Sequence, residues 1–156
     1  MWSDATQEAV LDAVADQLRQ ATALTPSLVR EVIARACLRT EAMRSAGKAK
    51  TLDRLVEDCA WCDVALALIE LELPAWSVRR LLHEDGEWFC SLSKDSSLPL
   101  ALDDTADSSH HALPLAILGA FVEAKRRVVA KEPAGRSLVP QMKPAPATVI
   151  CCENFS

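Results

Sequence analysis

The segment WSVRRLLHEDGEWFCSLS, residues 76–93, decides the fold that the sequence predicts. Two runs rich in apolar residues flank the dipeptide Asp85-Gly86, which is a favoured turn between antiparallel strands. The residues before this segment, and those from about 108 to 131, instead have the spacing of helices. We therefore expect a β-hairpin. Because two strands alone are marginally stable, we also expect a helix to cover its apolar face.

Two registers are open to this hairpin. A two-residue turn at positions 85–86 would pair His83 with Trp88 and leave apolar side chains on both faces. A three-residue loop at 84–86 would pair Leu82 with Trp88 and separate apolar from polar side chains, so we expect this second register. Its core face would carry Trp76, Val78, Arg80, Leu82, Trp88, Cys90 and Leu92, and its outer face Ser77, Arg79, Leu81, His83, Glu87, Phe89, Ser91 and Ser93.

Three helical segments are expected before the hairpin, over residues 4–23, 26–46 and 51–73. Thr25 followed by Pro26 is a strong start signal for the second of them. The third segment has two apolar stripes, which predicts burial on more than one side, at the centre of the fold or at a dimer interface. One stripe is Leu52, Leu55, Cys59, Cys62, Leu66, Ile69 and Leu73, and the other is Val64, Ala65, Leu68 and Leu71.

The chain after the hairpin divides into three parts. Residues 94–109 are polar, and the alternating Leu98, Leu100 and Leu102 within them would suit a short third strand. A helix over 113–130 is expected to pack on the hairpin. The remainder is rich in proline and lacks periodicity, which is typical of a flexible tail, although its apolar run Val-Ile-Cys-Cys could dock on the domain.

The predicted fold class is therefore α+β and mostly helical: three N-terminal helices, one β-hairpin with room for a short third strand, and a C-terminal helix packed on the hairpin. We expect a single globular domain over residues 1–131, made of a helical part at 1–73 and a hairpin-helix part at 74–131. Residues 132–156 would be the proline-rich flexible tail.

Composition excludes several classes of protein. Half of the 156 residues are hydrophobic and 25% are charged, as in soluble globular domains. A net charge of −5 disfavours a general nucleic-acid binder. The longest apolar run is far shorter than the roughly 20 residues of a membrane-spanning helix. Six cysteines in a chain that opens without a secretory signal indicate reduced thiols, so we expect a cytoplasmic protein.

The stretch from 71 to 127 also carries a resemblance to known proteins. The motifs LELPAWSVRRLL, DGEWFCSLS, LDDTADSSH and LPLAILGAFVEAKR resemble those of a family of small uncharacterised alphaproteobacterial proteins with no assigned activity. The order of hairpin, spacer and helix is also similar to small phage-derived modules in which a helix packs on a short sheet. The resemblance covers about a third of the chain and rests on structural motifs. It implies a bacterial protein and brings no catalytic residues with it.

Candidate chemical groups are few, and each has a simpler structural explanation. Cys59 and Cys62 have C-x-x-C spacing, but in the expected helix both lie mid-helix on an apolar stripe, where they serve as small core residues. A metal site would need two further ligands, and no second pair has zinc-ribbon spacing. His83 and Cys90 would point to opposite faces of the hairpin in the expected register. We expect no catalytic residue, no metal ligand and no cofactor.

A pair of histidines, His110 and His111, lies near the acidic residues Asp103, Asp104 and Asp107. These groups lack a convincing metal-ligand spacing, and short polar side chains at this point are typical of helix capping. An acid–base or cation site would require them to converge in a pocket.

Two surfaces could bind a partner. The outer hairpin face would present Arg79, Leu81, His83 and Phe89, which could contact a protein or stack on bases, unless another element or a second subunit covers them. The segment 26–46 and the turn after it are basic, but the neighbouring helical segments are acidic, so complementary packing explains this pattern without a ligand. Its basic residues are Arg30, Arg35, Arg39, Arg44 and Lys48.

These observations favour a cytoplasmic protein-interaction or regulatory module without catalysis, binding an unknown protein partner or a second copy of itself as a homodimer through 51–73 or the hairpin edge. The alternative is a nucleic-acid-associated factor that uses the basic segment 26–46 or the Arg79/Phe89 face. A metal-binding protein or an enzyme is less well supported, because no motif assembles a reactive set of side chains.

Overall fold

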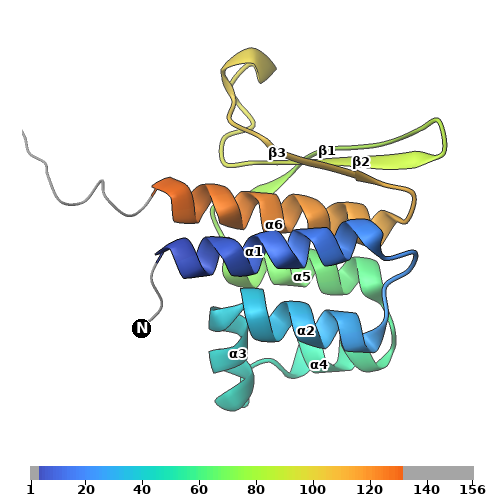
Figure 1. Cartoon of the computed structure of the whole chain (residues 1–156), viewed down its shortest axis with the longest axis vertical. Coiled ribbons are helices and arrows are strands. Elements are labelled where there is room, and N and C mark those ends of the chain that lie inside the picture. Colours follow the sequence, from blue (N-terminus) through green and yellow to red (C-terminus); the bar gives the residue numbers. More distant parts are fainter. Residues whose placement is uncertain (1–3, 132–156) are drawn as a thin grey trace, which may run out of the picture.

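The computed structural model describes residues 4–131 (Figure 1). The predicted tail at 132–156 lies outside the described residues. Over residues 4–131 helices dominate and three strands form one antiparallel sheet, so the predicted α+β, mostly helical class is confirmed. In chain order the elements are α1 (Asp4–Gln20), α2 (Pro26–Ala36), α3 (Leu38–Ser45), α4 (Lys50–Glu57), α5 (Trp61–Glu72), β1 (Ser77–Glu84), β2 (Glu87–Ser93), the 3₁₀-helix η1 (Leu100–Leu102), β3 (Ala106–His110) and α6 (Leu113–Lys131).

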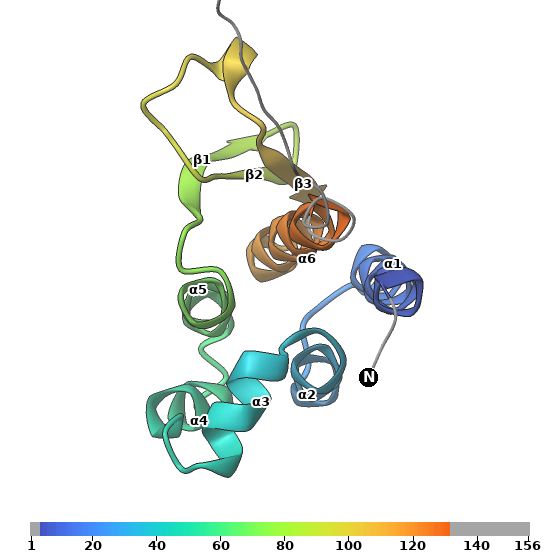
Figure 2. The same ribbon diagram turned by 90° about the vertical axis from the view of Figure 1, so that its left-hand side faces the viewer.

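Helix α6 lies between the sheet and the other helices (Figures 1 and 2). It packs against β2 and β3 on one side and against α1 and α5 on the other. Four consecutive residues, from Leu115 to Leu118, are buried, which is the pattern of a helix enclosed on every side. The prediction that the C-terminal helix packs on the hairpin sheet is confirmed, and the observed helix extends one residue beyond the expected 113–130.

The helix expected over 26–46 is broken at Cys37, whose φ of −123° and ψ of 67° are not helical. Glu72 of α5 accepts a hydrogen bond from the backbone N of Thr40 at 2.5 Å and so satisfies a free N–H group in the first turn of α3. The Nζ of Lys125 lies 3.0 Å from the other carboxylate oxygen of Glu72. The break therefore coincides with a buried polar contact that joins α3, α5 and α6.

The helix expected over 51–73 is also broken, at Cys59. Cys59 has a φ of 56°, and the N–H groups of Cys59 and Ala60 donate to the carbonyls of Val56 and Leu55. This is a Schellman motif, in which glycine usually occupies the left-handed position. The expected seven-residue stripe is therefore wrong as a continuous seam, because its two parts lie on different helices. Helix α5 instead buries three members of the second stripe, which are Val64, Ala65 and Leu68. It also buries Ile69 and Glu72.

The hairpin has the two-residue turn, so the three-residue loop that we expected is wrong. Asp85 and Gly86 have φ of 54° and 83°. Consecutive residues with positive φ match the twist of the flanking strands, which is why this turn is preferred in hairpins. Leu82 consequently pairs with Phe89 instead of Trp88. The turn geometry outweighs the separation of apolar from polar side chains on which the expectation rested.

A β-bulge near the start of β1 then shifts the pairing of β1 with β2 by one residue. The shift lies between Val78 and Arg80, and it restores the expected pairing of Val78 with Leu92. The expected division into a core face and an outer face fails as a result. Val78 and Leu82, expected in the core, are exposed, and Ser91 and Ser93, expected on the outer face, are buried. Of the residues expected on the core face, three are buried: Trp76, Cys90 and Leu92.

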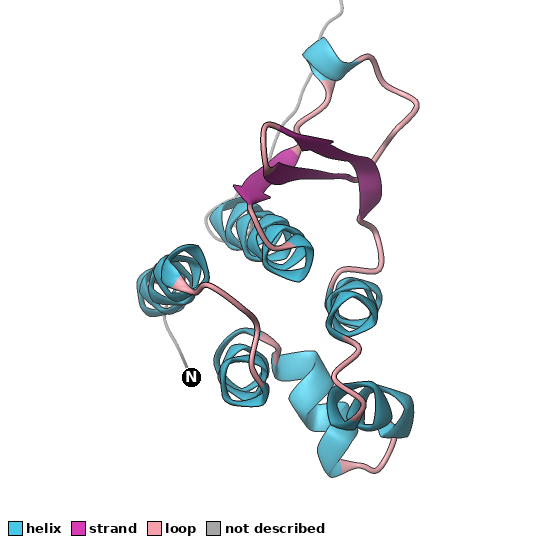
Figure 3. Ribbon diagram, turned by 90° about the vertical axis from the view of Figure 1, so that its right-hand side faces the viewer, coloured by secondary structure: helices cyan, strands magenta, loops and turns pink. Residues whose placement is uncertain are grey.

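The third strand of the sheet is β3, not the leucine-containing stretch (Figure 3). Residues 100–102 form η1, and the side chain of Leu102 is 72% exposed. Strand β3 has the polar sequence ADSSH and approaches α6 closely. A Cβ atom added to Gly119 would lie 2.1 Å from Ser108 Oγ and 3.0 Å from Ser108 Cβ, so the contact requires glycine. Small polar residues that pack in this way produce no apolar alternation in the sequence.

Candidate functional site

The four residues predicted to form a binding patch do not share a face of the sheet. Leu81 pairs with Cys90 and therefore lies on the face of the sheet that packs on α6. His83 lies on the same face, and its ring centroid is 4.6 Å from that of Trp88. Phe89 lies on the opposite face, because adjacent residues in a strand alternate. The two-residue turn thus separates side chains that the expected register placed together.

Arg79 has a structural role. Its guanidinium lies 2.6 Å from the buried carboxylate of Asp103 and donates to the carbonyl of Leu98 at 2.8 Å. Ser93 Oγ donates to the same oxygen of Asp103 at 2.6 Å. With 14% of its side chain exposed, Arg79 holds the 94–105 loop against the end of the sheet. It is therefore not available at the surface where the sequence placed it.

The opposite end of the hairpin carries an exposed patch that the sequence argument missed. We call it the hairpin-end surface. It encloses a shallow hollow of about 330 Å³. The guanidinium carbon of Arg80 lies 5.4 Å from the ring centroid of Phe89, within the range of a cation–π contact. The Asp-Gly dipeptide was the signal that could have located this surface, because it sets the register. Its members are Arg80, Leu82, Glu84, Asp85, Glu87, Phe89 and Ser109.

Strand β1 is an edge strand of the sheet and is exposed along almost its whole length. The strand order is β1-β2-β3, and every residue of β1 except Arg79 is exposed. Leu81 is 42% exposed on one face and Leu82 is 44% exposed on the other. The backbone groups along the outer side of an edge strand have no strand partner within the sheet. This edge therefore offers both hydrogen-bonding groups and apolar side chains to a partner.

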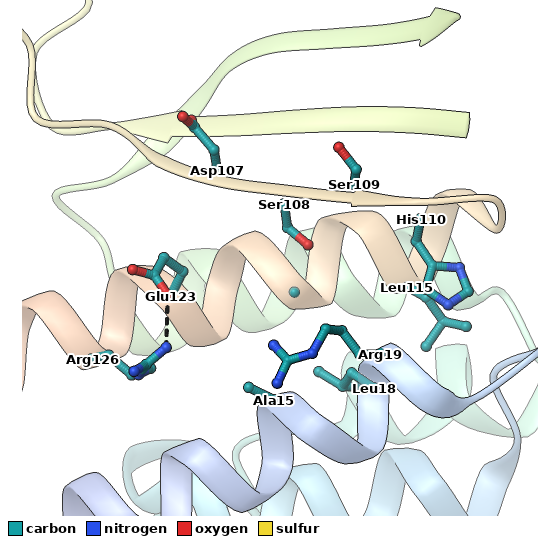
Figure 4. A pocket seen from close by; sticks show the side chains of 11 residues that line it. Ala15, Leu18, Arg19, Asp107, Ser108, Ser109, His110, Leu115, Glu123 and Arg126 are labelled. Atoms are coloured by element: carbon teal, nitrogen blue, oxygen red, sulfur yellow. Dashed lines mark hydrogen bonds and ion pairs between the residues drawn. The ribbon is translucent and has the colours of Figure 1, made fainter. Parts of the chain in front are cut away.

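A small polar cavity lies between α1, β3 and α6 (Figure 4). Its volume is about 70 Å³, well below the roughly 300 Å³ of a small-molecule site. Three of its charged groups are paired: Arg126 contacts Glu123 at 3.0 Å and Asp12 at 2.8 Å, and Arg19 pairs with Asp16. The geometry suits a polar contact between secondary-structure elements better than it suits a substrate site.

The two histidines hold parts of the chain together. Nε2 of His110 lies 2.9 Å from the carbonyl oxygen of Ala21, and Nε2 of His111 lies 3.1 Å from that of Thr22. The backbone N of Ala112 donates to Nδ1 of His110 at 3.0 Å, which leaves Nε2 as the protonated nitrogen of a neutral ring. The histidines thus join the α1–α2 connection to the end of β3.

Two of the three acidic residues expected near these histidines have other partners. Asp103 pairs with Arg79, and Asp104 pairs with Arg127 and with Lys131, whose Nζ is 2.9 Å away. The hydrogen bond from Lys131 holds the pKa of Asp104 below its ordinary value. Asp103 and Asp104 are therefore engaged away from the histidines, and Asp107 is the member of the acidic group that lines the small cavity with His110.

The C-x-x-C pair occupies a different place from the one expected. Cys59 is exposed between α4 and α5, and Cys62 lies in the first turn of α5. A helix N-terminus can activate a thiol, but burial and the neighbouring Asp63 raise the pKa of Cys62. Burial also raises the pKa of Cys90 to about 11, and it raises the pKa of Cys37 further. Within residues 4–131, no group of three or more His, Cys, Asp or Glu side chains is placed to hold a metal ion.

The basic segment is partly used in contacts between helices. Arg44 Nε lies 2.9 Å from Asp53 of α4, and Arg35 contacts Gln17 of α1 as well as Glu31 of its own helix. The other three basic residues are exposed: Arg30, Arg39 and Lys48.

None of the helices in the described range is long and apolar enough to cross a membrane. Comparisons of the chain with protein-family models, with curated proteins and with solved structures give no match.

Proposed function

We propose that this protein is a non-catalytic protein-interaction module that binds an extended strand of a partner along the free edge of β1. The observation that supports this proposal is the exposure of apolar side chains on both faces of an edge strand, at Leu81 and Leu82. An exposed edge with apolar side chains is a template for pairing with another chain. In such strand addition, main-chain hydrogen bonds give affinity and alternate side chains give specificity.

The site fits binding better than catalysis for a chemical reason. Arg126 and Glu123, which line the small cavity of Figure 4, pair with each other, and the histidines contact backbone carbonyls. The hollow of the hairpin-end surface is open and shallow, with Leu82 and Phe89 beside acidic and basic residues. That mixture of apolar and charged side chains is typical of protein interfaces.

The nucleic-acid alternative has less support. Arg79 is engaged with Asp103, which leaves exposed Arg30, Arg39 and Lys48 as the basic residues of that hypothesis. They are interspersed with acidic side chains, and the whole chain carries a net charge of −5. Phosphate backbones are bound by concentrated positive charge, which this surface lacks.

Affinity isolation with matched baits tests the proposal. The full-length chain, a Leu81→Asp/Leu82→Asp variant and a Leu102→Asp variant would each be used on lysate of the native cell. Leu102 is the control because it is an exposed leucine that lies on η1, away from β1. A partner should be retained by the native and Leu102→Asp baits and lost from the double variant.

The partner would then be purified and added to the full-length chain, and hydrogen exchange would be followed along β1. Slower exchange at Leu81 and His83 is expected, because strand addition protects the backbone N–H groups of the edge. Equal retention of the partner by the Leu81→Asp/Leu82→Asp bait, or unchanged exchange in β1, would contradict the proposed function.

A further inference from the structure

The partner of the β1 edge can be narrowed, on the basis of the proposed function, to one candidate. We infer that it is a second copy of this chain, which pairs antiparallel with the first through β1 around a twofold axis at Leu82. The pairing would join two three-stranded sheets into one six-stranded sheet. The inference rests on the backbone pattern and the charges of β1.

The backbone pattern limits where the twofold axis can lie. The pair Glu84–Glu87 closes a two-residue turn, and pairs with and without hydrogen bonds alternate along an antiparallel ladder. Leu82 and Glu84 therefore direct their backbone groups toward β2, while Leu81 and His83 direct theirs to the free edge. In a symmetric pair, outward-facing residues must meet outward-facing residues. The axis must then pass through a residue and not between two residues.

The charges select one of the remaining axes. An axis at Leu82 places Arg80 opposite Glu84 of the second copy, twice by symmetry, and places Leu82 opposite itself. An axis at Arg80 would place two arginines opposite each other, and an axis at Leu81 would place Leu82 opposite Arg80. An axis at His83 would place Leu82 opposite Glu84. Opposite charges and apolar pairs directly across a ladder are stabilising, so the axis at Leu82 is preferred.

The fold also sets the length of the paired segment. The bulge and the Arg79–Asp103 contact occupy the start of β1, and the turn begins at Asp85. Pairing therefore extends over Arg80 to Glu84. On the outer face it would bring together the two copies of Leu82, flanked by Phe89. An interface of this length is smaller than the roughly 1,600 Å² of a standard interface, so the dimer should depend on concentration.

Charge reversal with recombination tests this register. The mass of the full-length chain would be measured by sedimentation from about 1 to 500 µM, a range suited to a small interface. The native chain should shift from 17.0 kDa to twice that mass. Arg80→Glu and Glu84→Arg should each weaken dimerisation about tenfold or more, because each replaces two attractive pairs by two repulsive ones. An equimolar mixture of the two variants should form a heterodimer.

The matched control is Glu57→Arg. It makes the same change of charge as Glu84→Arg at an exposed residue of α4, outside the hairpin, and should leave the dimer largely intact. Thermal unfolding of each variant would show that it is folded. The inference is overturned if the native chain stays at 17.0 kDa over the whole range. It is also overturned if the single variants dimerise like the native chain, or if their mixture does not recombine.

Failure of this inference is distinguishable from failure of the proposed function. If the chain is monomeric and a captured partner protects the β1 amides, the dimer inference is rejected. The proposed function as an interaction module is then kept. A monomeric chain whose β1 amides are already slow to exchange would show that another segment of the same chain covers the edge, which contradicts both. Loss of edge-dependent capture together with a monomeric mass would contradict both as well.

Discussion

Strands β1 and β2 belong to the same hairpin but differ sharply in burial. The last four residues of β2, from Cys90 to Ser93, are all buried, including its two serines. Strand β1 contains Val78, Leu81 and Leu82, and all three are exposed. Helix α6 packs against β2, and the 94–105 loop contacts Ser93. Position relative to α6 and this loop, rather than the hydrophobicity of the side chain, decides which strand is buried.

The same contrast separates two adjacent arginines. Arg79 is held in a largely buried ion pair with Asp103, while Arg80 lies on the exposed hairpin end over Phe89. Of these two neighbouring residues, Arg79 therefore maintains the fold, and Arg80 is free to contact a partner. Substitutions in matched pairs can test this division.

The largest effect is expected from Leu92→Ala compared with Leu82→Ala. Leu92 is 0% exposed and Leu82 is 44% exposed. Loss of the buried side chain should lower the free energy of unfolding by about 3 kcal/mol, while loss of the exposed one should change it by about 0.5 kcal/mol or less. Chemical denaturation at low protein concentration, where the chain is monomeric, measures both. Similar losses for the two variants would show that β1 is covered in solution.

A smaller difference is expected between Arg79→Ala and Arg80→Ala. Removing Arg79 leaves Asp103 buried without its cation and should lower the free energy of unfolding by about 2 kcal/mol. Removing Arg80 should change it by about 0.5 kcal/mol or less, because its charge is solvated. Denaturation curves for both variants provide the measurement, and limited proteolysis of the 94–105 loop should accelerate only for Arg79→Ala. An unchanged Arg79→Ala protein would refute the structural role of this residue.

The smallest effect is expected from Asp104→Asn, in the 94–105 loop, where the carboxylate pairs with Lys131 at the end of α6. The pKa of Asp104 is lowered in the folded state, chiefly by its hydrogen bond with Lys131. A lowered folded-state pKa contributes stability above the unfolded-state pKa, and that contribution is lost as the pH falls through the folded-state pKa. Because the group is exposed, the native chain should exceed the variant by about 0.5 kcal/mol or less at pH 7. Thermal unfolding should show this difference shrinking as the pH falls below the ordinary pKa of an aspartate, about 4, and a difference that grows at low pH would contradict the assignment.

Much of the architecture follows from local signals in the sequence. The N-cap Thr25 and the last helix lie where propensity and spacing place them, since these features depend on neighbouring residues. The location of the hairpin turn at Asp85-Gly86 was also predicted, but its length was not. The break at Cys59 could not be foreseen, because it uses the left-handed conformation at a residue type that rarely adopts it. Strand β3 was also missed, because its burial depends on a distant glycine in α6.

The candidate site was less predictable than the fold. A shift of one residue in the hairpin register exchanges the faces of all the side chains on one strand. The expected register therefore selected Arg79 and missed Arg80, although the two are adjacent. The partners of His110 and His111 are backbone carbonyls about 90 positions away. Such long-range contacts leave no periodic signal in a single sequence.

Cys37 and Cys90 are buried, so their reaction with a thiol reagent can report local opening of the structure. Cys37 lies where α2 meets α3, and Cys90 lies in β2, so each part of the domain contains one concealed thiol. Both have a raised pKa as well as a buried sulfur, so an alkylating reagent can modify them only when the structure opens locally. The rates of modification at the two positions would then distinguish fluctuations of the helices from fluctuations of the sheet.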